Sequence, residues 1–195
     1  MAQRRFFDDD HVSDIESASF TKETYEADAV RRGRFGQFTR RFTDIPDGAT
    51  ASYYIENISD ADPITLVSPQ IQSTQGARLQ VIRNVNSYGT SNSQQNDVYN
   101  LQTDSDIQFD ETVYARTGTN VAIDGGTIID ESIIPGTTGG GTGVQRTGGT
   151  SRTGLVSRIA AGDDIVLRVT NTSGNAIIIA GTVPFVQEKL DDLPE

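Results

Sequence analysis

The chain has 195 residues, 35% of them hydrophobic, and a net charge of −11, which suits one domain with extensions and argues against wholesale disorder. It contains no cysteine and one histidine, which excludes disulfide frameworks, thiolate nucleophiles and metal clusters built on these residues. No apolar run is long enough to span a bilayer. Asp8–Asp10 occupy the position where a secretion signal needs an apolar stretch, so we expect no cleaved signal.

Residues 1–33 are predicted to form an N-terminal anchoring arm. Basic and acidic side chains balance over residues 1–41 and occur in blocks, whereas apolar residues are too scattered to give a helix an apolar stripe. We expect the arm to become ordered against a partner, as a basic arm docking on an acidic protein surface. The predicted contact residues are Arg4, Arg5, Phe6, Phe7, Phe20, Tyr25, Arg31, Arg32 and Arg34.

Residues 34–187 are predicted to form a β-sandwich domain. Phe38, Arg40 and Phe42 alternate with polar residues, and turn signals recur at short intervals without a sustained helical period. Further strands are expected at 49–58, 64–72, 78–85, 98–101, 112–116, 127–134, 164–171 and 176–186. The predicted fold class is therefore all-β, an antiparallel β-sandwich of the jelly-roll-like kind with an extended N-terminal arm.

The closing strands carry the clearest pattern. Ile165, Leu167 and Val169 lie on one face of the strand at 164–171, and the apolar run Ile177–Ile179 predicts a central, buried strand after the turn. The Gly/Thr-rich segment 135–154 is predicted to be a long loop, which is a binding loop, a contact loop or disordered. Residues 188–195 are predicted to be an acidic C-terminal tail.

No residue pattern completes a catalytic, cofactor-binding or metal motif, and we predict that the protein is not an enzyme. The glycines at 139–143 lack the Lys-Ser/Thr pair of a phosphate-binding loop. The net charge opposes binding of nucleic acid by the folded part. Whether an Asp pair binds Ca²⁺ or Mg²⁺ stays open. The candidates are Asp8–Asp10 with His11, Asp60 with Asp62, and Asp104 with Asp106.

The charged residues are biased in kind as well as in number. Arginine outnumbers lysine 14 to 2, and aspartate outnumbers glutamate 19 to 8. This balance resembles that of proteins from halophilic organisms, archaeal ones in particular. An acidic, lysine-poor surface stays soluble when salt screens charge repulsion.

Several turn motifs occur in an order that resembles a family of virion structural proteins of tailed phages and haloarchaeal tailed viruses. These motifs are an aromatic first strand at 34–38, an I-P-D-G-x-T turn at 45–50, an N-x-S turn at 57–59 and a closing hairpin at 162–175. Members of that family decorate capsids or virion appendages and have jelly-roll-like sandwiches. The long Gly/Thr insertion at 135–154 departs from the family pattern.

The resemblance implies a non-enzymatic virion protein of a haloarchaeal tailed virus, which decorates the capsid surface or forms a vertex turret and is attached through its arm. The implied partners are other copies of the chain, as a trimer or pentamer, and the major capsid protein, with host surface glycans as a further candidate and no nucleic acid or membrane. The implied location is the virion, and the host cytoplasm before assembly. Two alternatives stay open: a tail or baseplate protein that contacts the host surface, and a carbohydrate-binding module.

Overall fold

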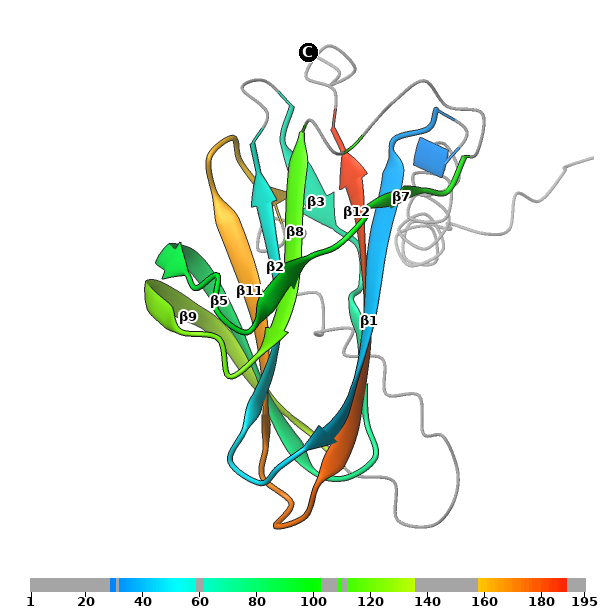
Figure 1. Ribbon diagram of the computed structural model, residues 1–195. Coiled ribbons are helices and arrows are strands. Elements are labelled where there is room, and N and C mark those ends of the chain that lie inside the picture. Colours follow the sequence, from blue (N-terminus) through cyan, green and yellow to red (C-terminus); the bar gives the residue numbers. More distant parts are fainter. Residues whose placement is uncertain are drawn as a thin grey trace, which may run out of the picture.

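The computed structural model describes residues 29–30, 32–58, 62–102, 109, 112–135 and 158–188. Within these ranges, twelve strands form two antiparallel sheets that pack face to face (Figure 1). The all-β sandwich predicted from the sequence is confirmed. The predicted contact residues Arg4, Arg5, Phe6, Phe7, Phe20, Tyr25 and Arg31 lie outside the described residues.

We call the two sheets A and B. The strands of sheet A are β1 (Phe35–Ile45), β3 (Ile64–Leu66), β4 (Gln70–Ser73), β7 (Tyr99–Asn100), β10 (Arg158–Ile159) and β12 (Ile177–Gln187). The strands of sheet B are β2 (Thr50–Asn57), β5 (Ala77–Tyr88), β6 (Ser93–Gln95), β8 (Val113–Thr119), β9 (Ile123–Ile134) and β11 (Asp164–Asn171). Sheet A has the order β10-β3-β12-β1-β7, with β4 also paired to β12, and sheet B has the order β6-β8-β2-β11-β5-β9.

The strand pairs are nested as in a jelly roll. The innermost pair is β5 with β9, followed outward along the chain by β3 with β10, β2 with β11, and β1 with β12. One long antiparallel ribbon rolled into two sheets gives this nesting. The connection between β5 and β9 carries three additional strands, of which β8 and β6 extend sheet B beside β2, and β7 extends sheet A beside β1.

Alternation along β11 sends every second side chain into the space between the sheets. Ile165, Leu167 and Val169 belong to this core, as their spacing predicts. Val166 points to the opposite face of sheet B, where it packs with Tyr54. The sequence pattern of this strand therefore predicts both of its faces correctly.

β12 is the central strand of sheet A, but its apolar run is not buried throughout. Ile177 and Ile179 lie in the core, whereas Ile178 is half-buried on the outer face of the sheet. The period of two in a strand holds even where three isoleucines follow one another. The prediction that all three are buried is wrong for Ile178.

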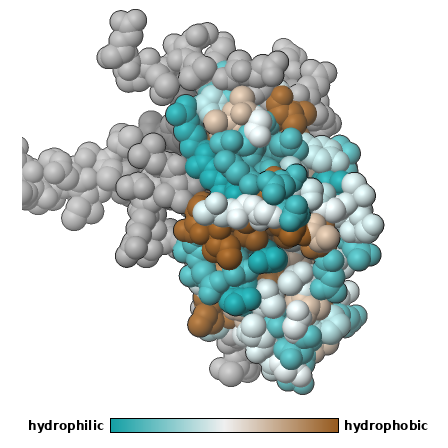
Figure 2. Space-filling view, turned by 90° about the vertical axis from the view of Figure 1, so that its left-hand side faces the viewer, coloured by the Kyte–Doolittle hydropathy of each residue, from teal (hydrophilic) through white to brown (hydrophobic). Residues whose placement is uncertain are grey.

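A second apolar cluster covers part of the outer face of sheet B. Its buried members are Tyr54, Ile82 and Val166. The rings of Tyr54 and Tyr88 stack with their centroids 4.7 Å apart. Figure 2, which faces this side of the molecule, shows hydrophobic side chains gathered in a band between hydrophilic ones. Sheet B is therefore apolar on both faces around Tyr54 and Val166.

The strand predictions need three corrections. The single strand expected at 64–72 is interrupted between β3 and β4, where Ser68 has a φ of 47° and Pro69 has no N–H to donate. β9 begins at Ile123, four residues before the expected start. The short strands β6 and β10 carry no apolar alternation, so periodicity does not reveal them.

Candidate contact surface

The chain enters the sandwich through a tight reversal at Gly33. The N–H of Arg34 donates to the carbonyl oxygen of Ala29 at 2.8 Å, and the N–H of Gly33 donates to that of Val30 at 3.0 Å. This pair of bonds is the Schellman pattern, which needs a left-handed residue, and Gly33 has a φ of 67°. The side chain of Asn100 fixes the reversal by donating to the carbonyl oxygen of Gly33 at 2.6 Å.

An apolar cluster holds this reversal against the outer face of sheet A. Ala29, Phe35 and Val186 are buried together, and Val30 and Val67 pack against them. We call these five residues the arm-exit cluster. Ala29 and Val30, near the end of the predicted arm, therefore pack against the sandwich.

Two large apolar side chains lie exposed beside the arm-exit cluster. Tyr99 of β7 is 58% exposed and Leu101 is 42% exposed. The N–H of Leu101 donates to the carbonyl oxygen of Phe35 at 3.0 Å, which ties both residues to the start of β1. Of the predicted contact residues, Arg32 is exposed and Arg34 half-buried at this same end of the sheet. Exposed apolar residues next to cations are typical of a protein contact site.

Further along the same face, sheet A is hollowed into a shallow depression of about 190 Å³. The strand register brings Thr39, Thr182 and Gln70 side by side in one row, and Arg41, Ala180 and Gln72 in the next. These six outward-facing side chains line the depression. Hydroxyl, amide and guanidinium groups together offer both hydrogen-bond donors and acceptors.

The outward positions of sheet A carry no carboxylate. They are Phe35, Gln37, Thr39 and Arg41 of β1; Ile178, Ala180, Thr182, Pro184 and Val186 of β12; and Gln70, Gln72, Thr65, Arg158 and Tyr99 of the other strands. We call this surface the sheet A face.

Acidic side chains do approach the margins of the sheet A face. Asp44, at the bulge near the end of β1, is the one acidic residue within the described strands of this sheet. Glu188, which follows β12, forms an ion pair with Arg158 at 2.9 Å. Arg41 is exposed and has no ion-pair partner among the described residues. The outward strand positions of the face therefore contribute no negative charge of their own to a contact with an acidic surface.

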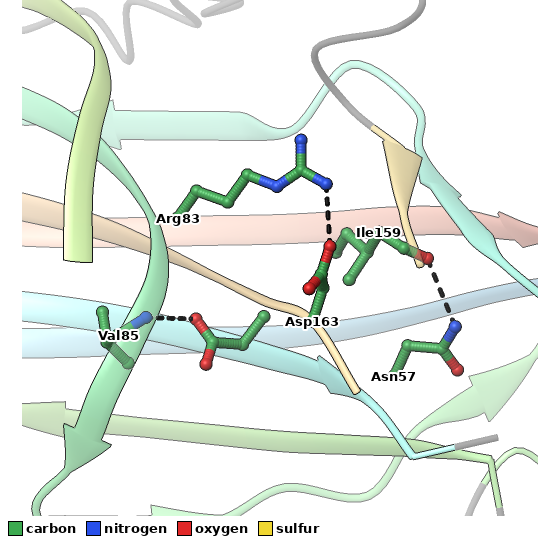
Figure 3. Close-up of polar contacts among 6 residues, drawn as sticks. Asn57, Arg83, Val85, Ile159 and Asp163 are labelled. Atoms are coloured by element: carbon green, nitrogen blue, oxygen red, sulfur yellow. Dashed lines mark hydrogen bonds and ion pairs between the residues drawn. The ribbon is translucent and has the colours of Figure 1, made fainter. Parts of the chain in front are cut away.

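The two aspartates of the closing motif, Asp163 and Asp164, have structural roles. Asp163 forms an ion pair with Arg83 at 2.9 Å, and Asp164 accepts a hydrogen bond from the backbone N–H of Val85 at 3.0 Å (Figure 3). Asn84, between these two β5 residues, has a φ of 54°, and the β5–β9 register shifts just after them, between Val85 and Ser87. The two aspartates therefore hold β5 next to this irregularity.

Burial raises the pKa of the Asp164 carboxyl above its usual value, and the negative charges of Glu56 and Asp163 add to this effect. Hydrogen bonds from the backbone of Val85 and Asn84 oppose it. A carboxyl with a raised pKa is a candidate acid or base. Asp164 is 8% exposed and already accepts a backbone hydrogen bond, so its geometry is that of a structural group.

The turn motifs of the sequence also support the fold. The amide of Asn57 donates to the carbonyl oxygen of Ile159 at 3.2 Å, across β2 and β10 (Figure 3). Asp47 of the I-P-D-G turn accepts a hydrogen bond from the N–H of Gly174 at 2.9 Å. These hydrogen bonds therefore connect strand ends and turns that are far apart in the sequence.

Of the acidic residues predicted as candidate metal ligands, only one lies within the described ranges. Asp62 is described and half-buried, whereas Asp8–His11, Asp60, Asp104 and Asp106 lie outside the described residues. Within the described part of the chain, no group of three or more His, Cys, Asp or Glu side chains could hold a metal ion. In the same ranges, no helix has the length and apolar character that a membrane span requires.

No family model, curated protein or solved structure matches this chain. The resemblance to virion structural proteins therefore depends on the order of the turn motifs and on the sandwich. The sheet A face is a surface that the sequence motifs do not reveal. Its residues come from six strands far apart in the chain, and the outward residues of each strand form no motif of their own.

Proposed function

We propose that this chain is a non-enzymatic structural protein of a haloarchaeal tailed virus, which decorates the capsid surface or forms a vertex turret. It is attached to the particle through its N-terminal arm, in symmetric groups of three or five copies. The observation that carries this proposal is the arm-exit cluster, in which Ala29 packs on Phe35 and Val186 at one end of the sheet A face. Arm and face then form one continuous attachment surface.

The fold supports the proposal by analogy. Jelly rolls form viral capsid and lectin domains, although one fold carries many functions. The side chains of the sheet A face indicate which kind of partner it binds. Arg41 in the depression would attract carboxylates, and Tyr99 and Leu101 would supply apolar contact area. The partner is therefore an acidic protein surface, such as that of a major capsid protein in a salt-rich cell.

Attachment can be measured by adding the purified protein to particles assembled without it and quantifying the bound copies after sedimentation. We expect deletion of residues 1–28 to abolish attachment. Arg41→Glu should weaken it by about tenfold, because it places a like charge in the contact. Arg78→Glu changes an exposed arginine on the outer face of sheet B and should leave attachment unchanged. Undiminished attachment of the truncated chain would overturn the proposal.

A carbohydrate-binding module is the second candidate, and the depression favours it. Thr39, Gln70, Gln72 and Thr182 offer hydroxyl and amide groups in a space of about 190 Å³, which suits a polar ligand such as a glycan. This function predicts binding of the isolated protein to host envelope, lost on Gln72→Leu and unaffected by deletion of residues 1–28. A decoration protein instead binds to particles, and it loses this binding when residues 1–28 are deleted.

A further inference from the structure

β9 forms one edge of sheet B and pairs with β5 along one of its sides. Among the described residues, no strand pairs with its other side, which presents a row of backbone N–H and C=O groups. β9 has twelve residues, as many as its partner β5 and more than any other described strand. An edge of this length can accept an added strand from another segment.

The side chains along this edge form an apolar, acidic and again apolar pattern. Ile128 is 50% exposed and Ile133 is 77% exposed, and the exposed carboxylates of Asp130 and Glu131 lie between them. Glu131 is held in place by Gln80, whose amide donates to it at 2.6 Å.

The acidic centre of the edge opposes pairing with a second β9. Two β9 strands that met antiparallel about a two-fold axis at the centre of this pattern would bring Asp130 and Glu131 of one copy opposite the same residues of the other. Like charges directly opposite one another destabilise a strand pair. The edge therefore favours an added strand that has cations at its centre and apolar side chains next to them.

We propose that the segment Arg4–Phe7 of a second copy of this chain adds to β9 as an antiparallel strand. This segment reads Arg-Arg-Phe-Phe, and the edge reads Ile-Ile-Asp-Glu. In one antiparallel register both arginines face both carboxylates, and both phenylalanines lie beside the isoleucines that precede Asp130. Opposite charges and aromatic–β-branched pairs are favourable cross-strand combinations. The facing pairs are Arg4 with Glu131 and Arg5 with Asp130. Phe6 and Phe7 then lie beside Ile128 and Ile129, where β9 bulges opposite Val81 and Ile82.

Position in the fold favours a second copy over the chain's own arm. Ala29 packs on Phe35 of β1, on the outer face of sheet A, whereas β9 is an edge of sheet B. Figure 1 shows β1 and β9 on opposite sides of the sandwich. A chain's own arm would have to pass around the whole domain to reach β9. The residues between Phe7 and Ala29 can span up to about 70 Å when extended, which is enough to reach a neighbouring copy.

This proposal does not depend on the virion assignment, because self-association is measured without particles. The full chain is analysed by size exclusion with light scattering over a concentration series. We expect Arg5→Asp and Asp130→Arg each to weaken self-association by about tenfold, and the combined variant to recover most of the loss. Asp97→Arg, which reverses an exposed acid outside β9, is the control. If the two variants behave like this control, or the combination restores nothing, the proposal is wrong.

Crosslinking tests the register and the source of the strand, since the chain contains no native cysteine. Gln3 and Ser132 face one another in the proposed register. A mixture of Gln3→Cys and Ser132→Cys chains should oxidise to disulfide-linked dimers, whereas Gln3→Cys mixed with Ile133→Cys should give several-fold fewer. A chain carrying both Gln3→Cys and Ser132→Cys that oxidises to a crosslinked monomer would show that the arm stays on its own copy. That result, or equal yields in the two mixtures, would overturn the proposal.

Discussion

Gly181 of β12 lies directly against the ring of Tyr53 of β2, and this contact joins the two sheets in the middle of the core. A Cβ atom at position 181 would stand 2.5 Å from Cζ of Tyr53 and 2.7 Å from Cδ1 of Ile71. The Tyr53 hydroxyl donates to the carbonyl oxygen of Arg40 at 3.1 Å. The ring therefore cannot move away without losing this hydrogen bond.

Gly181→Ala should lower the free energy of unfolding by about 1–3 kcal/mol, because the added methyl group overpacks the core. Urea denaturation followed by tyrosine fluorescence measures the change. Ala180→Gly is the neighbouring control, since Ala180 faces outward on the same strand. A Gly181→Ala variant as stable as the wild type would show that the ring of Tyr53 is free to shift.

The two adjacent isoleucines of β12 should respond differently to truncation. Ile179→Ala removes a fully buried side chain from the core and should cost about 2–5 kcal/mol. Ile178→Ala affects the half-buried outer face and should cost less than half as much. Thermal and urea unfolding of the two variants gives the comparison. The reverse order would mean that the face assignment of β12 is wrong.

Strict alternation between clear turn signals makes a strand predictable, and β11 shows this best. The expected strand at 164–171 coincides with β11, because its inward and outward residues alternate without interruption. β10 consists of only Arg158 and Ile159 and exists because it pairs with β3. No sequence pattern can encode a pairing of two residues, which depends on the partner strand.

The candidate contact surface was predictable only in part. Blocks of arginine and aromatic residues indicate an arm that needs a partner, but they do not show where the arm meets the domain. That position depends on Ala29, a small residue whose burial against Phe35 and Val186 gives no periodic signal. The depression likewise exists only after β1, β4 and β12 pair, because each strand alone contributes only two or three of its lining residues.

Stability should depend on the protonation of Asp164. Burial raises the pKa of this carboxyl in the folded protein above its value in the unfolded chain, so the folded state binds the proton more tightly. Between the usual aspartate pKa and the raised pKa, the contribution of Asp164 to stability should therefore fall as pH rises, and then level off. Urea unfolding across this range should show a weaker pH dependence for Asp164→Asn than for the wild type. Identical pH profiles would contradict the prediction.

Salt should stabilise the protein. The chain has a net charge of −11, and raising the salt concentration from about 0.1 M to 1 M shortens the Debye length from roughly 10 Å to 3 Å. Self-repulsion should then weaken, so we expect the melting temperature and the oligomeric fraction to rise in molar KCl. KCl is the suitable salt, because sulfate strengthens apolar burial in any protein. Equal melting temperatures at 0.1 M and 2 M KCl would argue against a halophilic origin.

Two truncations that differ by five residues should separate attachment from folding. Deleting residues 1–28 keeps Ala29 and Val30 on the sheet A face, so the sandwich should unfold at nearly the wild-type temperature. Deleting residues 1–33 exposes Phe35 and Val186 and removes the Gly33 carbonyl that Asn100 holds, and it should cost about 2–4 kcal/mol. Thermal unfolding of both truncated chains, beside the wild type, measures this difference. If both deletions leave stability unchanged, the arm-exit cluster contributes nothing to the fold, and the arm would join a sandwich that is complete from residue 34 onward.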